Sequence, residues 1–243
     1  MIIFRNIPNA IRIVRTTNEF GLLREQIYLA KEKGQFRRER RMILLAENRW
    51  GKRLCNSLGI EIEVTGRENL PKEGPVVYIS NHQSYADIPV HCAVLDTIQF
   101  GFVAKKELRK LPVYGPFIED IRSVLIDRTN PKTSMKAILE GISYIKDGFS
   151  LLIFPEGTRS KGPEMGEFHA GSLKLATKPE VPVIPITIDG SYRAFEDNGI
   201  FKGCTVRYTI HEPIETKGMS RDEKAGLAER VEKIVRSGLK DPL

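Results

Sequence analysis

Short apolar runs separated by amphipathic stretches dominate the chain after residue 60. The first run, residues 61–64, alternates Glu with Ile and Val, which is typical of a strand with one face in water. The later runs are mostly apolar and of strand length, as in a sheet covered on both faces. They occupy residues 75–80, 98–104, 124–126, 151–154, 183–188 and 205–210. Helical patterns lie between several runs, most clearly at residues 130–146. This alternation predicts an α/β fold with a mostly parallel central sheet flanked by helices.

Residues 1–60 follow a helical period and predict an N-terminal amphipathic two-helix arm. The first helix carries apolar residues at helical spacing: Ile3, Ile7, Ile11 and Val14. A break is expected near Gly34, and the second helix is predicted from about residue 36 to residue 58. Its apolar face holds Ile43, Trp50, Leu54 and Leu58. We therefore expect residues 1–60 to form the arm and residues 61–243 to form the main domain.

The positive charge of the chain is concentrated in this arm. The whole chain has a formal net charge of +7, but residues 1–60 hold 13 Lys and Arg against 5 Glu, a net charge of +8. A basic amphipathic helix pair with aromatic residues on its apolar side suits the headgroup layer of an anionic membrane. Two alternatives are a helical hairpin packed on the main domain and a nucleic-acid-binding segment. The apolar start at residues 1–4 favours lipid, so we predict an anionic membrane surface as the partner and no nucleic acid.

The composition also indicates where in the cell the protein is located. No run of 18 apolar residues exists, so no conventional transmembrane helix is expected, and the N-terminus lacks the small-residue cleavage site of a secretory signal. The three cysteines, Cys55, Cys92 and Cys204, are widely spaced, which favours a reducing compartment. The four histidines form no zinc-binding pattern, so no metal is expected. We predict a monotopic or peripheral protein at the cytoplasmic face of the cell membrane.

A candidate base and a carboxylate lie five residues apart in the stretch from Asn81 to Asp87. On one regular helix, His82 and Asp87 would point about 140° apart. They can meet only if His82 lies on a loop and Asp87 begins the following helix. Pro89 supports that placement, because proline is tolerated in the first helical turn. Asp87 would then orient His82 to take a proton from a hydroxyl. In the alternatives, Asp87 caps the helix or pairs with His91.

A candidate phosphate site follows one of the apolar runs. Residues 154–160 read Phe-Pro-Glu-Gly-Thr-Arg-Ser, in which glycine permits close backbone approach while hydroxyls and an arginine fork suit a phosphate. Loops at strand ends are where α/β sheets bind their ligands. The alternative is a turn in which Arg159 is solvated and paired with Glu156. Two further cations, Lys105 and Lys106, follow another strand end, although such a pair is usually only solvated.

The chain shows no sequence pattern for a covalent nucleophile. It has no Gly-x-Ser-x-Gly motif, no Walker loop and no dinucleotide-binding glycine motif. A base without a protein nucleophile indicates direct attack by a substrate hydroxyl. Together with the phosphate site and the basic apolar arm, this predicts a phosphorylated alcohol that resides in a membrane as the substrate.

Four sequence blocks stand in a fixed order between about residue 75 and residue 190. They are Asn-His-x4-Asp at residues 81–87, Ala-Lys-Lys-Glu-Leu to Ile-Asp-Arg at 104–128, Phe-Pro-Glu-Gly-Thr-Arg-Ser at 154–160 and Val-Pro-Val-Ile-Pro-Ile at 181–186. In this order they resemble the lysophosphatidic acid acyltransferases (1-acylglycerol-3-phosphate O-acyltransferases) of the glycerolipid acyltransferase family. A single His-x4-Asp is common by chance, whereas all four blocks in order are highly specific.

The resemblance implies an acyltransferase domain at residues 61–243. This domain would move a fatty acyl group from an acyl thioester to the 2-hydroxyl of lysophosphatidic acid, giving phosphatidic acid. His82 would be the general base, oriented by Asp87, and residues 181–186 would shape the site. The glycerol phosphate would be held by Lys105, Glu156, Gly157, Thr158 and Arg159. The family uses no metal or organic cofactor, and acyl-carrier protein (ACP) or coenzyme A (CoA) carries the acyl thioester.

Two positions depart from the family pattern. A lysine is expected between Phe168 and Gly171, where this chain has His169-Ala170, and a glycine is expected before Val124, where it has Arg122-Ser123. Neither departure touches the proton transfer, but the first bears on how a headgroup is held. Two alternatives therefore stay open: an acyltransferase for another lyso-lipid acceptor, and a non-catalytic lipid- or nucleic-acid-binding module.

Overall fold

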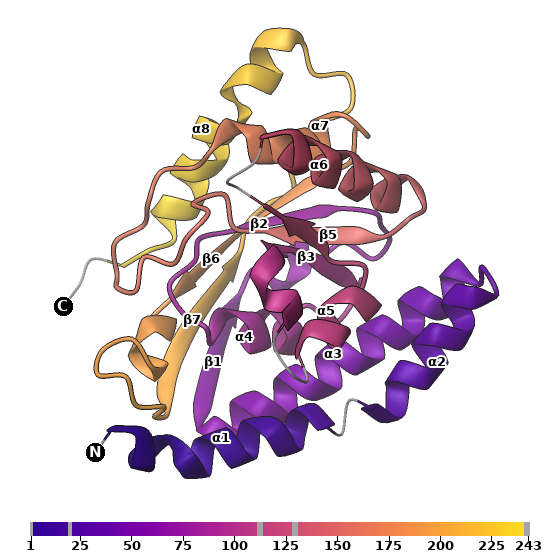
Figure 1. Cartoon of the computed structure of the whole chain (residues 1–243). Helices are drawn as coiled ribbons and strands as arrows, with labels where there is room; N and C mark the ends of the chain where they lie inside the picture. Colours follow the sequence, from indigo (N-terminus) through magenta and orange to yellow (C-terminus); the bar gives the residue numbers. More distant parts are fainter. Residues whose placement is uncertain (1, 19–20, 111–113, 128–130, 241–243) are drawn as a thin grey trace.

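The computed structural model describes residues 2–18, 21–110, 114–127 and 131–240, which contain one seven-stranded sheet. The spatial order of its strands is β1-β7-β6-β2-β5-β3-β4 (Figure 1). Their bounds are β1 (Ile60–Thr65), β2 (Val77–Ser80), β3 (Phe100–Lys105), β4 (Val124–Ile126), β5 (Ser150–Ile153), β6 (Val183–Asp189) and β7 (Cys204–Ile210). Neighbouring strands are parallel, except that β6 and β7 are antiparallel. The predicted mostly parallel α/β sheet is therefore confirmed.

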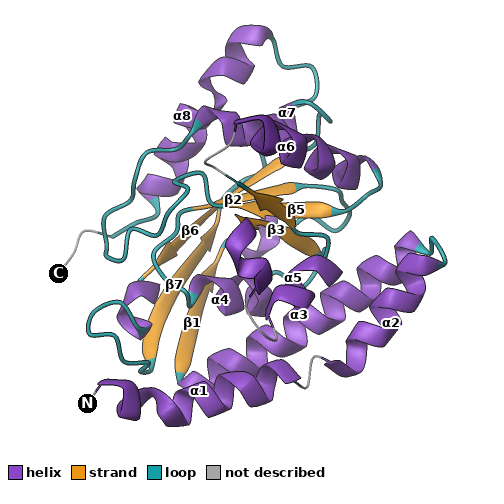
Figure 2. Ribbon diagram, in the orientation of Figure 1, coloured by secondary structure: helices purple, strands orange, loops and turns teal. Residues whose placement is uncertain are grey.

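Helices cover both faces of this sheet (Figure 2). One face carries α3 (Phe36–Leu58), α4 (Asp87–Val94) and α5 (Tyr114–Asp120). The other face carries α6 (Pro131–Lys146), α7 (Lys174–Thr177) and α8 (Arg221–Ser237). Short 3-10 turns are η1 (Arg67–Asn69), η2 (Lys106–Lys110), η3 (Ala170–Leu173) and η4 (Ser191–Ala194). On β2, Tyr78 enters the first core, whereas Val77 and Ile79 enter the second. Because both faces are buried, the strand shows no alternation of apolar and polar residues.

The described part of the N-terminal segment contains three helices instead of the two predicted: α1 (Ile2–Asn18), α2 (Gly21–Glu32) and α3. The second predicted helix is confirmed as α3, and it follows a turn at Gly34, whose φ of 62° lies in the left-handed region that glycine favours. The first predicted helix is divided into α1 and α2.

The apolar face of α3 packs inside the protein. Trp50 and Leu54 belong to the same core cluster as residues of the sheet. Gly51 lets α3 approach α4 closely, since a Cβ atom there would lie 2.4 Å from the Ala93 amide nitrogen. Trp50 is only 3% exposed, and its Nε1 donates to Thr17 Oγ1 at 3.2 Å. The expectation that Trp50 faces a membrane is therefore wrong, and for α3 the packing alternative is the correct one.

Helix α1 differs from α3 because it leaves an apolar stripe in solvent. Ile7, Ile11 and Val14 are 45, 62 and 49% exposed, and their spacing of four and three residues places them on one face. Arg12 and Arg15 are exposed on the same helix. None of the described helices is both long and apolar enough to cross a bilayer.

Candidate active site

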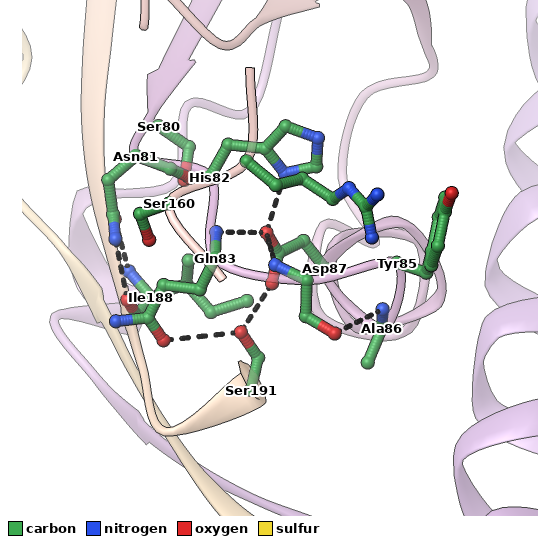
Figure 3. Close-up of polar contacts among 12 residues, drawn as sticks. Ser80, Asn81, His82, Gln83, Tyr85, Ala86, Asp87, Ser160, Ile188 and Ser191 are labelled. Carbon is green, nitrogen blue, oxygen red and sulfur yellow. Dashed lines mark hydrogen bonds and ion pairs between the residues drawn. The ribbon is translucent and has the colours of Figure 1, made fainter. Parts of the chain in front are cut away.

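His82 and Asp87 meet at the junction between β2 and α4 (Figure 3). His82 lies on the loop after β2, and Asp87 is the first residue of α4, with 2.7 Å between His82 Nδ1 and Asp87 Oδ2. The predicted placement is therefore confirmed. Both alternatives for Asp87 are wrong. Ala86 occupies the N-cap position of α4, and no side chain there bonds to the helix amides. His91 Nδ1 lies 2.7 Å from the Tyr208 hydroxyl oxygen instead.

The Asp87 side chain is completely buried, and both of its oxygens accept hydrogen bonds. Besides His82, Oδ2 accepts from the backbone amides of Gln83 at 2.7 Å and Ser84 at 2.9 Å. Oδ1 accepts from Ser191 Oγ. Because a carboxylate only accepts, a neutral His82 ring must carry its proton on Nδ1. Nε2 is then left with the lone pair that a general base needs.

The imidazole of His82 packs flat on the ring of Phe154. The ring centroids are 3.9 Å apart, and the ring planes are inclined by 16°. This contact holds the imidazole between an aromatic face and the Asp87 carboxylate. The His82 side chain is still 17% exposed, so a substrate can reach it from outside. The base is therefore fixed in one orientation without being sealed in the core.

The neighbouring imidazole of His91 has a different environment. It is completely buried and lies tilted against Phe154, with 5.5 Å between the ring centroids. Burial lowers the pKa of His91 to about 3, because removing the charged ring from water is costly. His91 therefore stays neutral at physiological pH and contributes to the packing of the core.

Side chains of the loop after β2 are anchored to the end of β6. Asn81 Nδ2 donates to the Ile188 carbonyl at 2.8 Å, and Asn81 Oδ1 accepts from the Ile188 amide at 2.8 Å. Gln83 Oε1 accepts from the Gly190 amide at 2.9 Å. These contacts extend the pairing of β2 and β6 beyond the last strand residue, so the loop that carries the base is held rigidly.

The loop after β5 lies against the His82 loop because β2 and β5 are parallel neighbours. Glu156 accepts from the His82 amide at 2.6 Å and from the Gly166 amide at 2.8 Å. The Ser160 amide donates to the His82 carbonyl at 2.8 Å. Burial raises the pKa of Glu156, and the two backbone hydrogen bonds oppose that rise. Both Glu156 oxygens thus accept hydrogen bonds from amides of the chain, so this residue supports the loop that carries His82.

Arg159 lies at the same rim as His82, and its carboxylate partner is not Glu156. Arg159 Nη1 donates to Glu196 Oε1 at 2.6 Å, and the guanidinium carbon lies 3.4 Å from the centroid of the Tyr85 ring. The alternative that paired Arg159 with Glu156 is therefore wrong. The Arg159 side chain remains 19% exposed, so its other donors can be reached by an anion.

Gly157 and Thr158 form the outer part of the loop after β5. Gly157 has a φ of 74°, a backbone conformation that other residues rarely adopt, and Thr158 is exposed. Lys105, the last residue of β3, is exposed at the same edge of the sheet, but β5 lies between β3 and β2. The spacing of two strand positions separates it from the end of β2 by roughly 10 Å. The structure thus gathers the predicted residues at one edge, with Lys105 farthest from the base.

Three contributors to the site were not predicted from the sequence: Tyr85, Ser191 and Glu196. Tyr85 stands at a variable position of the first block, and the other two follow the fourth block. No spacing or composition marks them, because only the fold brings them to the His82 loop. Among the described residues, no group of three or more His, Cys, Asp or Glu side chains is placed to hold a metal ion.

The Acyltransferase family model matches residues 61–189, which is more than half of the 243 residues. This chain belongs to the acyltransferase family, as the four blocks predicted.

Within this family, the chain is similar to 1-acyl-sn-glycerol-3-phosphate acyltransferases. A 1-acyl-sn-glycerol-3-phosphate acyltransferase of Borreliella burgdorferi is 31% identical over 170 residues, which cover 70% of this chain and 68% of that protein. A chloroplastic 1-acyl-sn-glycerol-3-phosphate acyltransferase of Brassica napus is 35% identical over 155 residues, covering 63% of this chain and 44% of that protein. The chain therefore spans less than half the length of such plant relatives. The crystal structure of the 1-acyl-sn-glycerophosphate (LPA) acyltransferase PlsC from Thermotoga maritima matches with a TM-score of 0.80 at 30% identity, over 98% of this chain and 96% of that chain.

Proposed function

We propose that this protein transfers a fatty acyl group from an acyl thioester to the 2-hydroxyl of lysophosphatidic acid, giving phosphatidic acid. The observation that carries the proposal is the oriented pair of His82 and Asp87 on a rim where Arg159 is also accessible. The names of the relatives support the same acceptor. The co-substrate is the thioester of ACP or CoA, and no metal or organic cofactor takes part.

Proton transfer through His82 accounts for the proposed chemistry. His82 Nε2 takes the proton of the acceptor hydroxyl as the hydroxyl oxygen attacks the thioester carbonyl carbon. The C–S bond then breaks, and the leaving thiolate takes the proton back from the imidazolium. The Asp87 carboxylate keeps Nδ1 protonated and stabilises the imidazolium between these two steps. Because the hydroxyl attacks directly, the step needs no acyl-enzyme intermediate.

The phosphate of the acceptor is proposed to bind Arg159, together with Gly157 and Thr158 and with assistance from Lys105. Replacing Arg159 with alanine is expected to raise the KM for lysophosphatidic acid about 10- to 100-fold, the range for losing a hydrogen bond to a charged group. The measurement is the initial rate of phosphatidic acid formation by purified protein, with an acyl thioester as the second substrate.

An exposed arginine on α8 provides the matched control, because Arg230→Ala removes the same charge away from the site. The KM of that variant should stay within about twofold of the wild-type value. Unchanged kinetics in Arg159→Ala would remove this residue from the phosphate site. If the wild-type protein forms no product from any acyl thioester, the alternative of a non-catalytic lipid-binding module replaces the proposed function.

We further propose that α1 lies on the anionic surface of the membrane, at its cytoplasmic face. The exposed stripe of Ile7, Ile11 and Val14 offers apolar area to the acyl chains, and Arg12 and Arg15 on the same helix offer charge to the headgroups. An amphipathic helix with both features binds in the plane of the interface. Because Ile43, Trp50 and Leu54 of α3 are buried, we assign the main membrane contact of the arm to the stripe on α1.

A triple variant tests this contact: Ile7→Ser, Ile11→Ser and Val14→Ser. We expect at least about a tenfold loss of affinity for vesicles that contain phosphatidylglycerol, since apolar area is removed from the lipid contact. Sedimentation with vesicles measures the bound fraction. Leu139→Ser is a suitable control, because Leu139 is 52% exposed on α6, across the sheet from α3. Full binding by the triple variant would contradict the membrane role of α1.

A further inference from the structure

Glu196 joins the two loops of the site, although it lies outside all four sequence blocks. Glu196 lies just after η4, and its side chain is only 4% exposed. Oε1 accepts from Arg159 Nη1 at 2.6 Å and from the Tyr85 amide at 3.3 Å, while Oε2 accepts from Ser84 Oγ at 2.5 Å. One buried carboxylate therefore contacts both the loop that carries His82 and the arginine proposed to hold phosphate.

This pairing fixes the guanidinium of Arg159 on two sides. Glu196 binds one end, and the Tyr85 ring covers one face at 3.4 Å. An arginine has five N–H donors in a planar fork, so the contact through Nη1 leaves others for a ligand. A guanidinium that is already ordered loses less conformational freedom when the ligand binds. The negative charge of Glu196 weakens the attraction of Arg159 for an anion, but it holds the remaining N–H donors of Arg159 in one orientation.

Glu196 also reaches the residues that orient the base. Ser84, whose hydroxyl donates to Glu196, donates its backbone amide to Asp87 Oδ2 at 2.9 Å. Asp87 in turn holds His82 Nδ1. A short series of hydrogen bonds thus connects the guanidinium with the imidazole through the carboxylates of Glu196 and Asp87, with Ser84 between them.

We infer that Glu196 is a positioning residue: it sets the separation between Arg159 and His82, and thereby the distance between phosphate and reacting hydroxyl that an acceptor must match. This inference rests on the proposed function, because it assumes that Arg159 meets the phosphate and His82 the hydroxyl. Glu196 itself touches neither reacting atom. It acts on Arg159, and the loop of Ser84 is the support to which it ties the guanidinium. Asn81 and Gln83 hold that loop independently of Glu196.

The loop that carries Glu196 is held from outside by α1. Asn6 Nδ2 donates to the Gly199 carbonyl at 2.7 Å, and Asn6 Oδ1 accepts from the Phe201 amide at 3.0 Å. Asn9 Nδ2 donates to the Phe201 carbonyl at 2.8 Å. Inside the loop, the rings of Phe195 and Phe201 lie 4.5 Å apart. The position of Glu196 is therefore fixed by contacts on both sides, as a positioning residue requires.

Steady-state kinetics of Glu196→Ala and Glu196→Gln test this inference. Glu196→Ala is expected to raise the KM for lysophosphatidic acid about tenfold, whereas the rate with 1-acylglycerol, which lacks the phosphate, should change less than about twofold. The KM for lysophosphatidic acid in Glu196→Gln should stay within about threefold of the wild-type value, because glutamine keeps one acceptor oxygen.

A double variant shows whether Glu196 and Arg159 act as one unit. In an Arg159→Ala background, the further effect of Glu196→Ala on this KM should fall below about twofold, because the effects of such residues are not additive. Asp197→Ala, on the same loop and paired only at the surface with Lys202, is the control.

Several outcomes would overturn the inference. A lowered KM in Glu196→Gln would mean that the carboxylate competes with the phosphate, and equal losses with both acceptors would mean a general structural role. A second measurement does not depend on turnover: the Nε–H resonance of Arg159 should be single and sharp in the wild type and broadened in Glu196→Ala. If the wild type does not acylate lysophosphatidic acid, the proposed function fails. A sharp resonance in both proteins would refute the positioning role by itself.

Discussion

Replacing His82 with alanine is expected to lower kcat for acyl transfer by about two to four orders of magnitude, the usual contribution of a positioned general base. The variant keeps Arg159 and the loop after β5, so the KM for lysophosphatidic acid should change little. The loss should appear in kcat because His82 Nε2 acts on the proton that moves in the transition state. Initial rates at saturating acyl thioester and acceptor measure the effect.

The loss of kcat in His82→Ala supports the general-base mechanism only if the variant is folded. His82 is 17% exposed and its ring lies on Phe154, so truncation removes one stacking contact and the hydrogen bond to Asp87. Asp87 Oδ2 keeps its two backbone donors. With about 1 kcal/mol for each lost contact, we expect the melting temperature to fall by roughly 4–8 °C and the protein to stay folded. A folded His82→Ala protein that retains turnover within tenfold of the wild type would refute the general-base mechanism.

The strands were predictable because their pattern is local. A strand buried on both faces must be apolar throughout, and the runs at residues 124–126 and 183–188 match β4 (Val124–Ile126) and β6 (Val183–Asp189) closely. The pair of His82 and Asp87 was predictable for the same reason. Five residues and one proline leave only the loop-and-helix arrangement in which the two side chains can meet.

Glu196 and Ser191 could not be predicted, because their partners are far away in the sequence. Glu196 bonds to Ser84 across 112 residues, and Ser191 bonds to Asp87 across 104 residues. A single polar residue on a loop has no period, and its contacts depend on the order in which β6 and β2 pair. Such residues become visible only when the topology is known.

The N-terminal helices show a second limit of prediction from the sequence. An amphipathic pattern indicates that one face is covered, but it does not identify what covers it. Trp50 was expected at a lipid surface, and it is buried against the protein core. Ile11 belongs to the same kind of pattern and is 62% exposed. Only the packing of α3 against α4 separates the two cases.

Arg122 departs from the family pattern, which predicts a glycine just before β4. Its φ of 60° lies in the left-handed region, where glycine is favoured and other residues are strained. The side chain explains why an arginine is accommodated. Arg122 Nε and Nη2 donate to the two oxygens of Glu39 at 2.6 and 2.9 Å, and the Glu39 side chain is completely buried on α3. The guanidinium also lies over the ring of Phe149 at 4.8 Å.

Arg122→Ala should therefore be strongly destabilising, because it leaves the buried Glu39 carboxylate without its partner. Breaking a buried pair from one side costs about 3–5 kcal/mol, which corresponds to a fall in melting temperature of roughly 6–20 °C for a chain of this size. Thermal unfolding followed by circular dichroism measures the change. As a control, Lys233→Ala breaks the pair with Glu229 on α8, where both side chains are more than 70% exposed. The expected cost there is about 0–1 kcal/mol.

A double variant separates the lost ion pair from other consequences of truncating Arg122. Arg122→Gly restores the glycine that the family pattern predicts and relieves the left-handed backbone, while Glu39→Leu removes the carboxylate that would be left unpaired. Replacing both members of a buried pair by apolar groups is often neutral or stabilising, so the double variant should recover most of the stability lost in Arg122→Ala. If it is as unstable as the single variant, the stacking of the guanidinium on Phe149 carries the stability instead. If Arg122→Ala costs no more than Lys233→Ala, the ion pair does not hold α3 to the sheet.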